Sequence, residues 1–387
     1  MAEGYPRESK VYQSERHGML SILDMLNYFE EKGTKRVTDL HIKVGIPPLY
    51  RMDGSLVRLK GPPVTPELAE KLIYPMLSDR CLERFRSGYH VDCSHRLGSI
   101  QFRINVFKEN DGICAAIRGL SLNIPPVEEI GFPNEVWSDI VDQRNGLVLV
   151  TGVAGSGKST TIASLIDRIN EEYAHRIITL EDPIEYIYQQ KRSAISQREL
   201  GKDVDSFANG LRAVLREDPN VILVGEMRDL ETITMTLMAA ETGHLVFSTL
   251  HTRDAAGTIN RILDFFPEGR QSDVVRSQLS LGLRYIICQK LIPRKDRKGR
   301  VAAMEILNNN QACANLIRAG KIEQIYSQLQ TRTRDRSDER MITAEKHLNR
   351  LVEEGTIEES DALRWANSLK DFIMEREHGR DSDDKPD

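Results

Sequence analysis

The feature that most constrains the fold is the glycine-rich stretch GVAGSGKST at residues 152–160. An apolar run over 146–151 precedes it and predicts a buried strand, and apolar residues at helical spacing over 158–171 predict a helix after it. Glycines let backbone N–H groups surround phosphates, a lysine reaches the β and γ oxygens, and a hydroxyl, here that of Ser159, ligates Mg²⁺. The stretch therefore predicts a P-loop. The predicted nucleotide contacts are Gly152, Gly155, Ser156, Gly157, Lys158, Ser159 and Thr160.

Two acidic segments follow later predicted strands. The run VILVGE ends in Glu226, which we expect to hold Mg²⁺ through water at the end of a strand beside the P-loop. The segment LEDPIE supplies Glu181, Asp182 and Glu185, and hydrolysis needs such a group to position or deprotonate water. An acidic turn that only caps a helix is the alternative interpretation of this second segment.

A predicted strand over 245–250 has a histidine at each end, His244 and His251. A single histidine is more often a structural group than a catalytic one. Two histidines at the ends of a core strand in the nucleotide-binding sheet indicate a sensor of the γ-phosphate, with a structural role for both as the alternative.

The order of the predicted elements divides the chain into two domains. Helical patterns alternate with period-two patterns over 19–120, which predicts a small α+β domain. The helical patterns cover 19–32 and 66–87, and the strand patterns lie within 36–59 and 97–119. A stretch with three prolines and no clear period predicts a linker over 121–133.

From residue 134 to residue 374 we expect an α/β domain. Continuous apolar runs over 176–180, 221–225 and 245–250 suit strands buried on both faces of a mainly parallel sheet. Beyond about residue 270 the pattern predicts mostly helices. We expect a flexible N-terminus and a disordered, highly charged tail, residues 1–18 and 375–387. The mixed-sign charge run over 331–340 predicts a solvated loop, with a basic binding patch as the alternative.

Composition excludes several classes of function. The 387-residue chain has a formal net charge of −5 and 6% aromatic residues, which counts against stable nucleic-acid binding and against a nucleic-acid translocase. No apolar run approaches the roughly 18 residues of a membrane span, and the first residues lack a signal-peptide core. We therefore expect a cytoplasmic protein that reaches a membrane only through a partner. None of the five cysteines forms a C-x-x-C pair, which argues against a zinc site.

Four segments together resemble the secretion ATPases of type II secretion and type IV pili. They are GVAGSGKSTT, TLEDPIEYI, LREDPNVILVGEMRDLET and AAETGHLVFSTLHT, and they match the Walker A motif, Asp box, Walker B motif and His box in order and spacing. Within the family, GEMRDLET and ETGHLVFSTLHT are most similar to the twitching-motility retraction ATPases. The resemblance extends from about residue 20 to about residue 370.

The resemblance implies a PAS-like N-terminal domain joined to a RecA-like ATPase core with a helical C-terminal region. It also implies a homohexameric ring with ATP and Mg²⁺ between subunits, which drives an inner-membrane pilus platform protein and is peripheral to that membrane. By position, the implied catalytic residues are Glu185, Glu226, His244, Arg103 and Arg118. The implied metal ligands are Ser159 and Glu226.

The chain departs from this subgroup near its C-terminal end. The subgroup motif A-I-R-N-L-I-R-E is replaced by residues 312–319, in which Ala314 and Ala319 stand for an arginine and a glutamate. The charge run over 331–340 replaces a glycine-containing loop. Both changes lie in the region linked to retraction rather than hydrolysis. The alternative is a pilus-extension or type II secretion ATPase, although the tetracysteine metal site usual in that class is missing.

Overall fold

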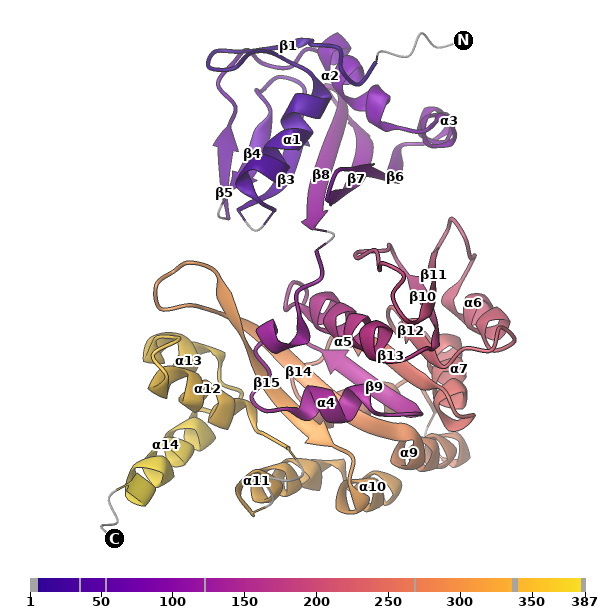
Figure 1. The fold of residues 1–387 in the computed structure, drawn as a ribbon, viewed down its shortest axis with the longest axis vertical. Coiled ribbons are helices and arrows are strands. Elements are labelled where there is room, and N and C mark those ends of the chain that lie inside the picture. Colours follow the sequence, from indigo (N-terminus) through magenta and orange to yellow (C-terminus); the bar gives the residue numbers. More distant parts are fainter. Residues whose placement is uncertain are drawn as a thin grey trace. The chain divides into compact units, whose positions relative to one another are not determined.

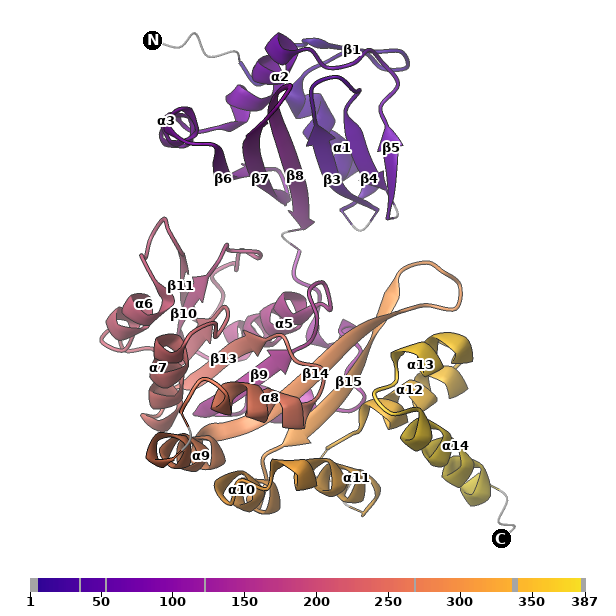
Figure 2. The same cartoon turned by 180° about the vertical axis from the view of Figure 1, so that it is seen from behind.

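The chain contains two compact units, Met1–Asn123 and Ile124–Asp387 (Figures 1 and 2). The computed structural model describes residues 6–34, 36–52, 54–121, 123–267, 269–335 and 340–383. No helix in these ranges is both long and apolar enough to cross a membrane.

The first unit is an α+β fold. Its elements are β1 (Tyr12–Ser14), β2 (Gly18–Leu20), α1 (Ile22–Lys32), β3 (Val37–Ile42), β4 (Leu49–Met52), β5 (Ser55–Arg58), α2 (Pro66–Ile73), η1 (Tyr74–Met76), α3 (Asp79–Ser87), β6 (His90–Leu97), β7 (Ile100–Glu109) and β8 (Gly112–Ser121). Within its described residues, six strands form an antiparallel sheet in the order β5-β4-β3-β8-β7-β6, and β1 pairs separately with β2.

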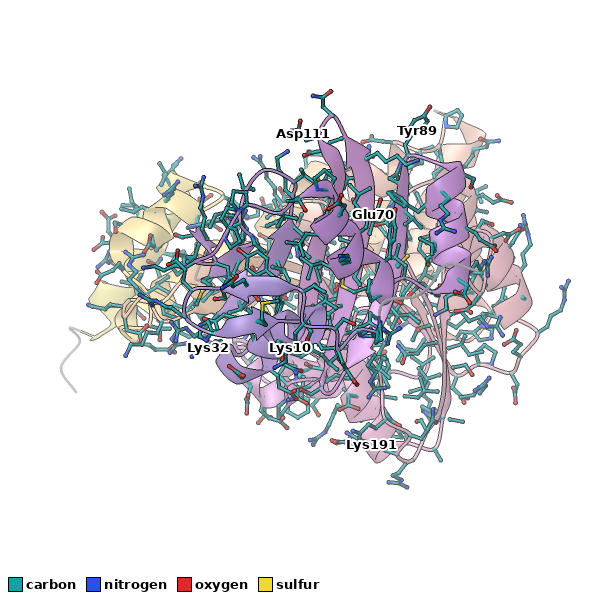
Figure 3. The ribbon with its side chains drawn as sticks, turned by 90° about the horizontal axis from the view of Figure 1, so that it is seen from above. Lys10, Lys32, Glu70, Tyr89, Asp111 and Lys191 are labelled. Carbon is teal, nitrogen blue, oxygen red and sulfur yellow. The ribbon has the colours of Figure 1, made fainter. Side chains whose placement is uncertain are left out.

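Alternation along the strands gives this sheet one apolar and one polar face. On β7, Phe102 and Ile104 are fully buried, whereas Arg103 between them is exposed. Helix α1 packs on the apolar face, where a Cβ at Gly119 would lie 2.5 Å from the Phe29 ring, so helix and sheet approach closely. Glu70 of α2 and Tyr89, both labelled in Figure 3, are exposed on this unit.

The second unit is an α/β fold that ends in helices. Its elements are η2 (Val127–Glu129), α4 (Val136–Val141), β9 (Gly146–Thr151), α5 (Lys158–Glu172), β10 (Arg176–Glu181), β11 (Ala194–Glu199), α6 (Phe207–Val214), β12 (Val221–Val224), α7 (Leu230–Glu241), β13 (Leu245–Leu250), α8 (Ala255–Leu263), α9 (Arg270–Gly282), β14 (Leu283–Pro293), β15 (Arg300–Asn308), α10 (Gln311–Arg318), η3 (Ile322–Gln324), α11 (Ile325–Asp335), α12 (Ala344–Glu353), α13 (Glu359–Trp365) and α14 (Leu369–Asp383).

The described strands of this unit form one sheet in the order β11-β10-β12-β13-β9-β14-β15. Neighbours are parallel, except that β14 and β15 are antiparallel. The predicted α/β class, with a mainly parallel sheet and a helical C-terminal region, is confirmed. The carboxyl ends of the parallel strands lie at one edge, which is where open α/β sheets bind ligands.

Both faces of this sheet are covered, as the continuous apolar runs predicted. On β9, Leu147 and Leu149 belong to the core with α7, α8 and α9, whereas Val148 and Val150 belong to the core with α4 and α5. Figures 1 and 2 show these two sets of helices on opposite faces. The two cores fix the direction of β9, and therefore the position of the loop that follows it.

The prediction of mostly helical structure after about residue 270 was wrong for β14 and β15. Seven of the eleven residues of β14 are buried, because this strand pairs with β9 on one side and with β15 on the other. The apolar run within β14, residues 285–288, is too short to distinguish a covered strand from a buried helix, so the pairing decides its conformation.

The N-terminal segment also differs from the expectation of a flexible stretch over residues 1–18. The β1–β2 hairpin orders part of it, and Tyr12 is fully buried with its Oη donating to Pro62 O at 2.9 Å. An aromatic ring with a satisfied hydroxyl holds this segment against the unit. Residues 1–5 of the expected flexible segment lie outside the described residues.

The C-terminal tail is also more ordered than the sequence predicts. We expected disorder from residue 375, but α14 continues to Asp383. Phe372 is buried near its start, and an ion pair joins Arg376 to Glu359 of α13. Of the charge run, residues 331–335 belong to α11 and not to a loop. Residues 336–339 and 384–387 lie outside the described part of the chain.

Candidate nucleotide-binding site

Strand β9 leads into the glycine-rich loop at the carboxyl edge of the sheet. Gly152, Gly155 and Gly157 have φ values of 144°, 76° and 89°, which side chains rarely allow. A Cβ would lie 2.3 Å from Gln289 O at Gly152 and 2.8 Å from Gln289 Nε2 at Gly157. Backbone conformation and space therefore both require glycine at these two positions.

Gln289 of β14 holds the loop from below. Its Nε2 donates to Ser156 O at 2.9 Å, and its Oε1 accepts from Thr161 Oγ1 of α5 at 2.7 Å. The side chain is only 3% exposed. Gln289 was not predicted as a site residue, because its position beneath the loop depends on β14, which was expected to be helical.

Lys158 is the first residue of α5, and its side chain is buried against the loop. Its Nζ donates to Gly152 O at 2.9 Å and to Val153 O at 3.2 Å. Burial lowers the pKa of this ammonium, whereas the carboxylates of Glu226 and Glu185 act in the opposite direction. The positive charge therefore lies where the predicted phosphate would need it.

The loop has the donors that a phosphate group requires. Ser156 Oγ is buried and has no hydrogen-bond partner within the described residues. The first N–H groups of α5 point along the helix axis toward the same loop and have no partners inside the helix. Ser159 lies in this first turn, and Thr160 Oγ1 is 2.7 Å from Tyr186 Oη. These residues fit the phosphates of a nucleotide.

Glu226 and Asp182 follow β12 and β10, which are parallel neighbours, so both carboxylates lie at the edge of the P-loop. Arg228 joins them, with its Nε 2.8 Å from Glu226 Oε2 and its Nη1 3.1 Å from Asp182 Oδ2. His251 Nε2 is 3.4 Å from Glu226 Oε1, and His251 Nδ1 is 3.4 Å from Lys158 Nζ. His251 thus connects the P-loop to Glu226. Sequence reasoning missed Arg228, although it lies within the quoted GEMRDLET segment.

Glu181 ends β10 and supports the loop that carries Glu185. Its carboxylate accepts from Thr179 Oγ1 at 2.6 Å and from Gln197 Nε2 at 3.2 Å, and also from the backbone N–H of Glu185. Burial raises the pKa of Glu181 to about 7. Glu185 is half-buried and close enough for its charge to act on Lys158. The three acids of this segment therefore have different surroundings.

A sequence profile of the family described as type II/IV secretion system protein matches residues 49–373 of the chain. The chain belongs to this family.

Relatives at high identity agree with this assignment. The type IV pilus retraction ATPase PilT of Pseudomonas aeruginosa is 42% identical over 354 residues, which are 91% of this chain and 100% of that protein. A twitching motility protein of Neisseria gonorrhoeae is 44% identical over 322 residues, or 83% of this chain and 84% of that protein. The crystal structure of the pilus retraction motor PilT with bound ADP matches with a TM-score of 0.82 at 42% identity, covering 92% of this chain and 99% of that chain. The resemblance read from the four motifs is confirmed.

In this type II/IV secretion system protein, the structure does not bring His244 to the P-loop. His244 precedes β13 at the amino edge of the sheet, where its carbonyl accepts from Gly146 N and its Nδ1 lies 3.0 Å from Ala239 O. Strand β9 begins at Gly146, beside His244, and the P-loop begins after its last residue, Thr151. At about 3.3 Å per residue, the six residues of this strand separate His244 from the P-loop by about 20 Å. His251, at the carboxyl end of β13, lies in the site instead.

Arg103 and Arg118 belong to the first unit of this secretion system protein. They lie directly opposite each other on β7 and β8, on the polar face of the sheet. Arg118 Nε is 2.8 Å from Asp39 Oδ1, and its side chain is 62% exposed. Both guanidinium groups are therefore available at the surface of the unit.

Proposed function

We propose that this chain is an ATPase motor that couples ATP hydrolysis to retraction of a type IV pilus. The observation that carries the proposal is the meeting of Lys158, Glu226 and His251 at one edge of a parallel sheet. The similarity to PilT over nearly the whole chain supports a type IV pilus as the structure that the motor would retract.

Phosphate binding is assigned to the P-loop. Lys158 would exchange its bonds to the loop carbonyls for the β and γ oxygens, and Ser156 Oγ would gain a partner. Mg²⁺, when bound, neutralises charge on the transferring phosphoryl group. Ser159 would hold it directly and Glu226 through water, since Mg²⁺ usually keeps several waters and takes few protein ligands.

Water activation is assigned to Glu185. Asp182 is paired with Arg228, and Glu181 is engaged by Thr179 and Gln197, so neither is poised to meet a water molecule. Glu185 is half-buried on a supported loop and would take the proton of the attacking water on a carboxylate oxygen. His251, in hydrogen-bonding reach of Lys158 and Glu226, is the proposed sensor of the γ-phosphate.

Arg103 and Arg118 are proposed to act on nucleotide held by a neighbouring subunit of a homohexamer. Like charges opposite each other on a sheet are destabilising, and Asp39 is paired with Arg118. A bound phosphate anion would relieve the repulsion between the two guanidinium groups. We propose that turnover moves the domain over 19–120 relative to the domain over 134–374 about the linker over 121–133.

The proposed setting is the cytoplasmic side of the inner membrane. A platform protein of the pilus would recruit the motor there, so that membrane association is peripheral and depends on the partner. We do not propose nucleic acid as a partner.

Deleting the gene and counting surface pili tests the cellular function. Retraction predicts excess pili and loss of twitching, and a Lys158→Ala copy should fold, fail to hydrolyse ATP and fail to restore twitching. Loss of pili would instead indicate an extension motor. Unchanged pili and twitching would contradict any role in that pilus system.

A further inference from the structure

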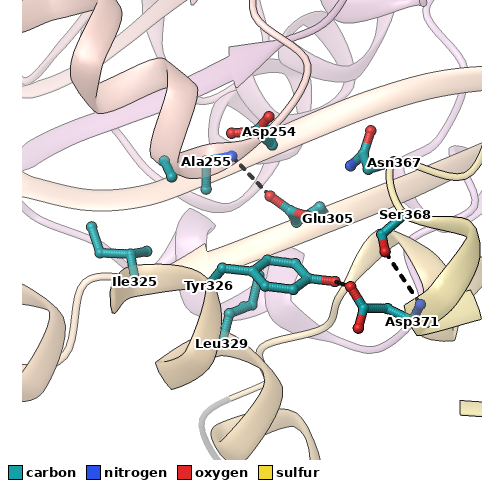
Figure 4. A pocket seen from close by; sticks show the side chains of 10 residues that line it. Asp254, Ala255, Glu305, Ile325, Tyr326, Leu329, Asn367, Ser368 and Asp371 are labelled. Carbon is teal, nitrogen blue, oxygen red and sulfur yellow. Dashed lines mark hydrogen bonds between the residues drawn. The ribbon is translucent and has the colours of Figure 1, made fainter. Parts of the chain in front are cut away.

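A cavity of about 270 Å³ lies between the sheet and the C-terminal helices of the second unit (Figure 4). Six polar side chains line it, and three of them are carboxylates; they are Asp254 before α8, Glu305 of β15, Tyr326 of α11, Asn367 and Ser368 before α14, and Asp371 of α14. None of its lining residues belongs to the P-loop. A ligand bound in this cavity would therefore not occupy the P-loop.

Glu305 is the main polar group of the cavity. It is 1% exposed, and its Oε1 accepts from Ala255 N at 2.8 Å. Its Oε2 is buried without a hydrogen-bond partner in the described part of the chain. A buried carboxylate oxygen left unpaired is costly, so this wall of the cavity calls for a hydrogen-bond donor.

On the facing wall, two carboxylate oxygens share one hydroxyl donor. Tyr326 Oη lies 3.2 Å from Asp371 Oδ2 and 3.2 Å from Glu345 Oε2. The phenol has a single hydrogen and can donate to only one of these carboxylates at a time. Glu345 is fully buried, and its Oε1 already accepts from Asn367 N at 2.8 Å and from Ser368 N at 3.0 Å. Another donor in the cavity would satisfy the second carboxylate.

The nearby ammonium group of Lys290 does not donate a hydrogen bond to Glu305 Oε2. Lys290 Nζ donates to Trp365 O and to Asn367 Oδ1, each at 2.6 Å. Its ammonium therefore points to these two oxygens, while Glu305 Oε2 has no partner. The excess of carboxylates around the cavity favours a positively charged guest.

We propose that this cavity binds an organic cation, a guanidinium or ammonium group on a short alkyl chain. Such a guest supplies N–H donors to Glu305 and Asp371, and the Tyr326 ring offers a surface for cation–π contact. Ile325 and Leu329 provide apolar wall for the alkyl part. The volume is close to the lower end of small-molecule sites, about 300 Å³, and far larger than a metal ion needs. No cluster suited to a metal ion occurs among the described residues.

The proposal implies a dependence on pH. Burial raises the pKa of Glu305 to about 8, and a bound cation favours the ionised carboxylate. Binding at neutral pH should therefore release a proton, and affinity should rise between about pH 6 and about pH 8. The charged and titratable groups around Glu305 are Asp254, Cys288, Lys290, Tyr326, Glu345 and Asp371.

Calorimetry on the full-length protein tests the proposal with agmatine, blocked arginine (N-acetyl-arginine methylamide) and tetramethylammonium. Agmatine should bind, and titrations in two buffers of different ionisation enthalpy should show proton release. Tetramethylammonium has no N–H donor and should not bind. Agmatine binding more tightly than blocked arginine indicates a free amine as the natural guest, whereas equal or tighter binding of blocked arginine indicates a protein side chain.

Two variants locate the binding. Glu305→Gln and, independently, Asp371→Asn should each weaken agmatine binding by about tenfold or more. Glu354→Gln, at an exposed carboxylate of α12's end, should leave it unchanged. If Glu305→Gln does not fold, Asp371→Asn and the pH dependence of the native protein decide the matter. Absence of agmatine binding at millimolar concentration, or equal binding by the folded variants, overturns the proposal.

Discussion

Replacing Gln289 with leucine should loosen the P-loop although Gln289 itself is not expected to touch nucleotide. Its amide joins Ser156 O at 2.9 Å and Thr161 Oγ1 at 2.7 Å, and so ties the loop and α5 to β14. Leucine has a similar volume and removes both hydrogen bonds. The close approach at Gly157, where a Cβ would lie 2.8 Å from Gln289 Nε2, shows how tightly this amide is packed.

The expected magnitude follows from burial. Gln289 is 3% exposed, so the Ser156 carbonyl would lose its partner in a dry environment, at a cost of about 1–3 kcal/mol. The Thr161 hydroxyl can turn to a carbonyl of its own helix, so its loss should be nearer the net value of about 1 kcal/mol. We expect the free energy of unfolding of the second unit to fall by about 2–4 kcal/mol.

Urea unfolding monitored by tryptophan fluorescence measures this loss. Both tryptophans, Trp137 and Trp365, lie in the second unit, so the signal reports that unit alone. ADP affinity, measured by calorimetry, should weaken by about tenfold because the loop is no longer held in its binding conformation. Thr161→Val should cost about 1 kcal/mol, and a double-mutant cycle with Gln289→Leu should show coupling. An unchanged unfolding midpoint with unchanged ADP affinity would refute the reasoning.

The other predictions concern the assignment of charges around the nucleotide. Glu185→Gln should still bind Mg-ATP and lose turnover by about 10²-fold or more. Glu226→Gln should lose turnover as well, and its nucleotide affinity should depend less on Mg²⁺. Single-turnover hydrolysis and nucleotide affinities with and without Mg²⁺ separate the two variants, and near-normal hydrolysis by Glu185→Gln would show that Glu185 is not the base. Mixing the inactive double variant Arg103→Ala, Arg118→Ala with Lys158→Ala should restore some ATPase activity, because mixed interfaces contain both intact halves; no recovery in subunits shown to mix would count against action between subunits.

The P-loop could be predicted because its parts are neighbours in the chain. A strand, three glycines at positive φ and the lysine that begins α5 all lie within a short stretch, so the spacing alone determines the local structure. The apolar runs of β9, β10, β12 and β13 also determined a mainly parallel sheet, since strands covered on both faces must be apolar throughout.

The other contacts of the site depend on strand order and direction, which no local pattern specifies. His244 and His251 flank the same strand, and only the parallel pairing of β13 with β9 places His251, and not His244, at the P-loop edge. Arg228 reaches Asp182 because β12 lies beside β10 in the sheet, although β11 and α6 separate them in the chain.

The tertiary structure alone decided what supports the P-loop and what lines the cavity. Gln289 lies under the loop because β14 adds to the sheet beside β9. Glu305 of β15, Tyr326 of α11 and Asp371 of α14 line one cavity because the chain brings these three elements together. Such contacts join residues far apart in the chain, so their stability comes from packing and burial. The P-loop conformation, in contrast, is set by glycines that lie within a few residues of one another.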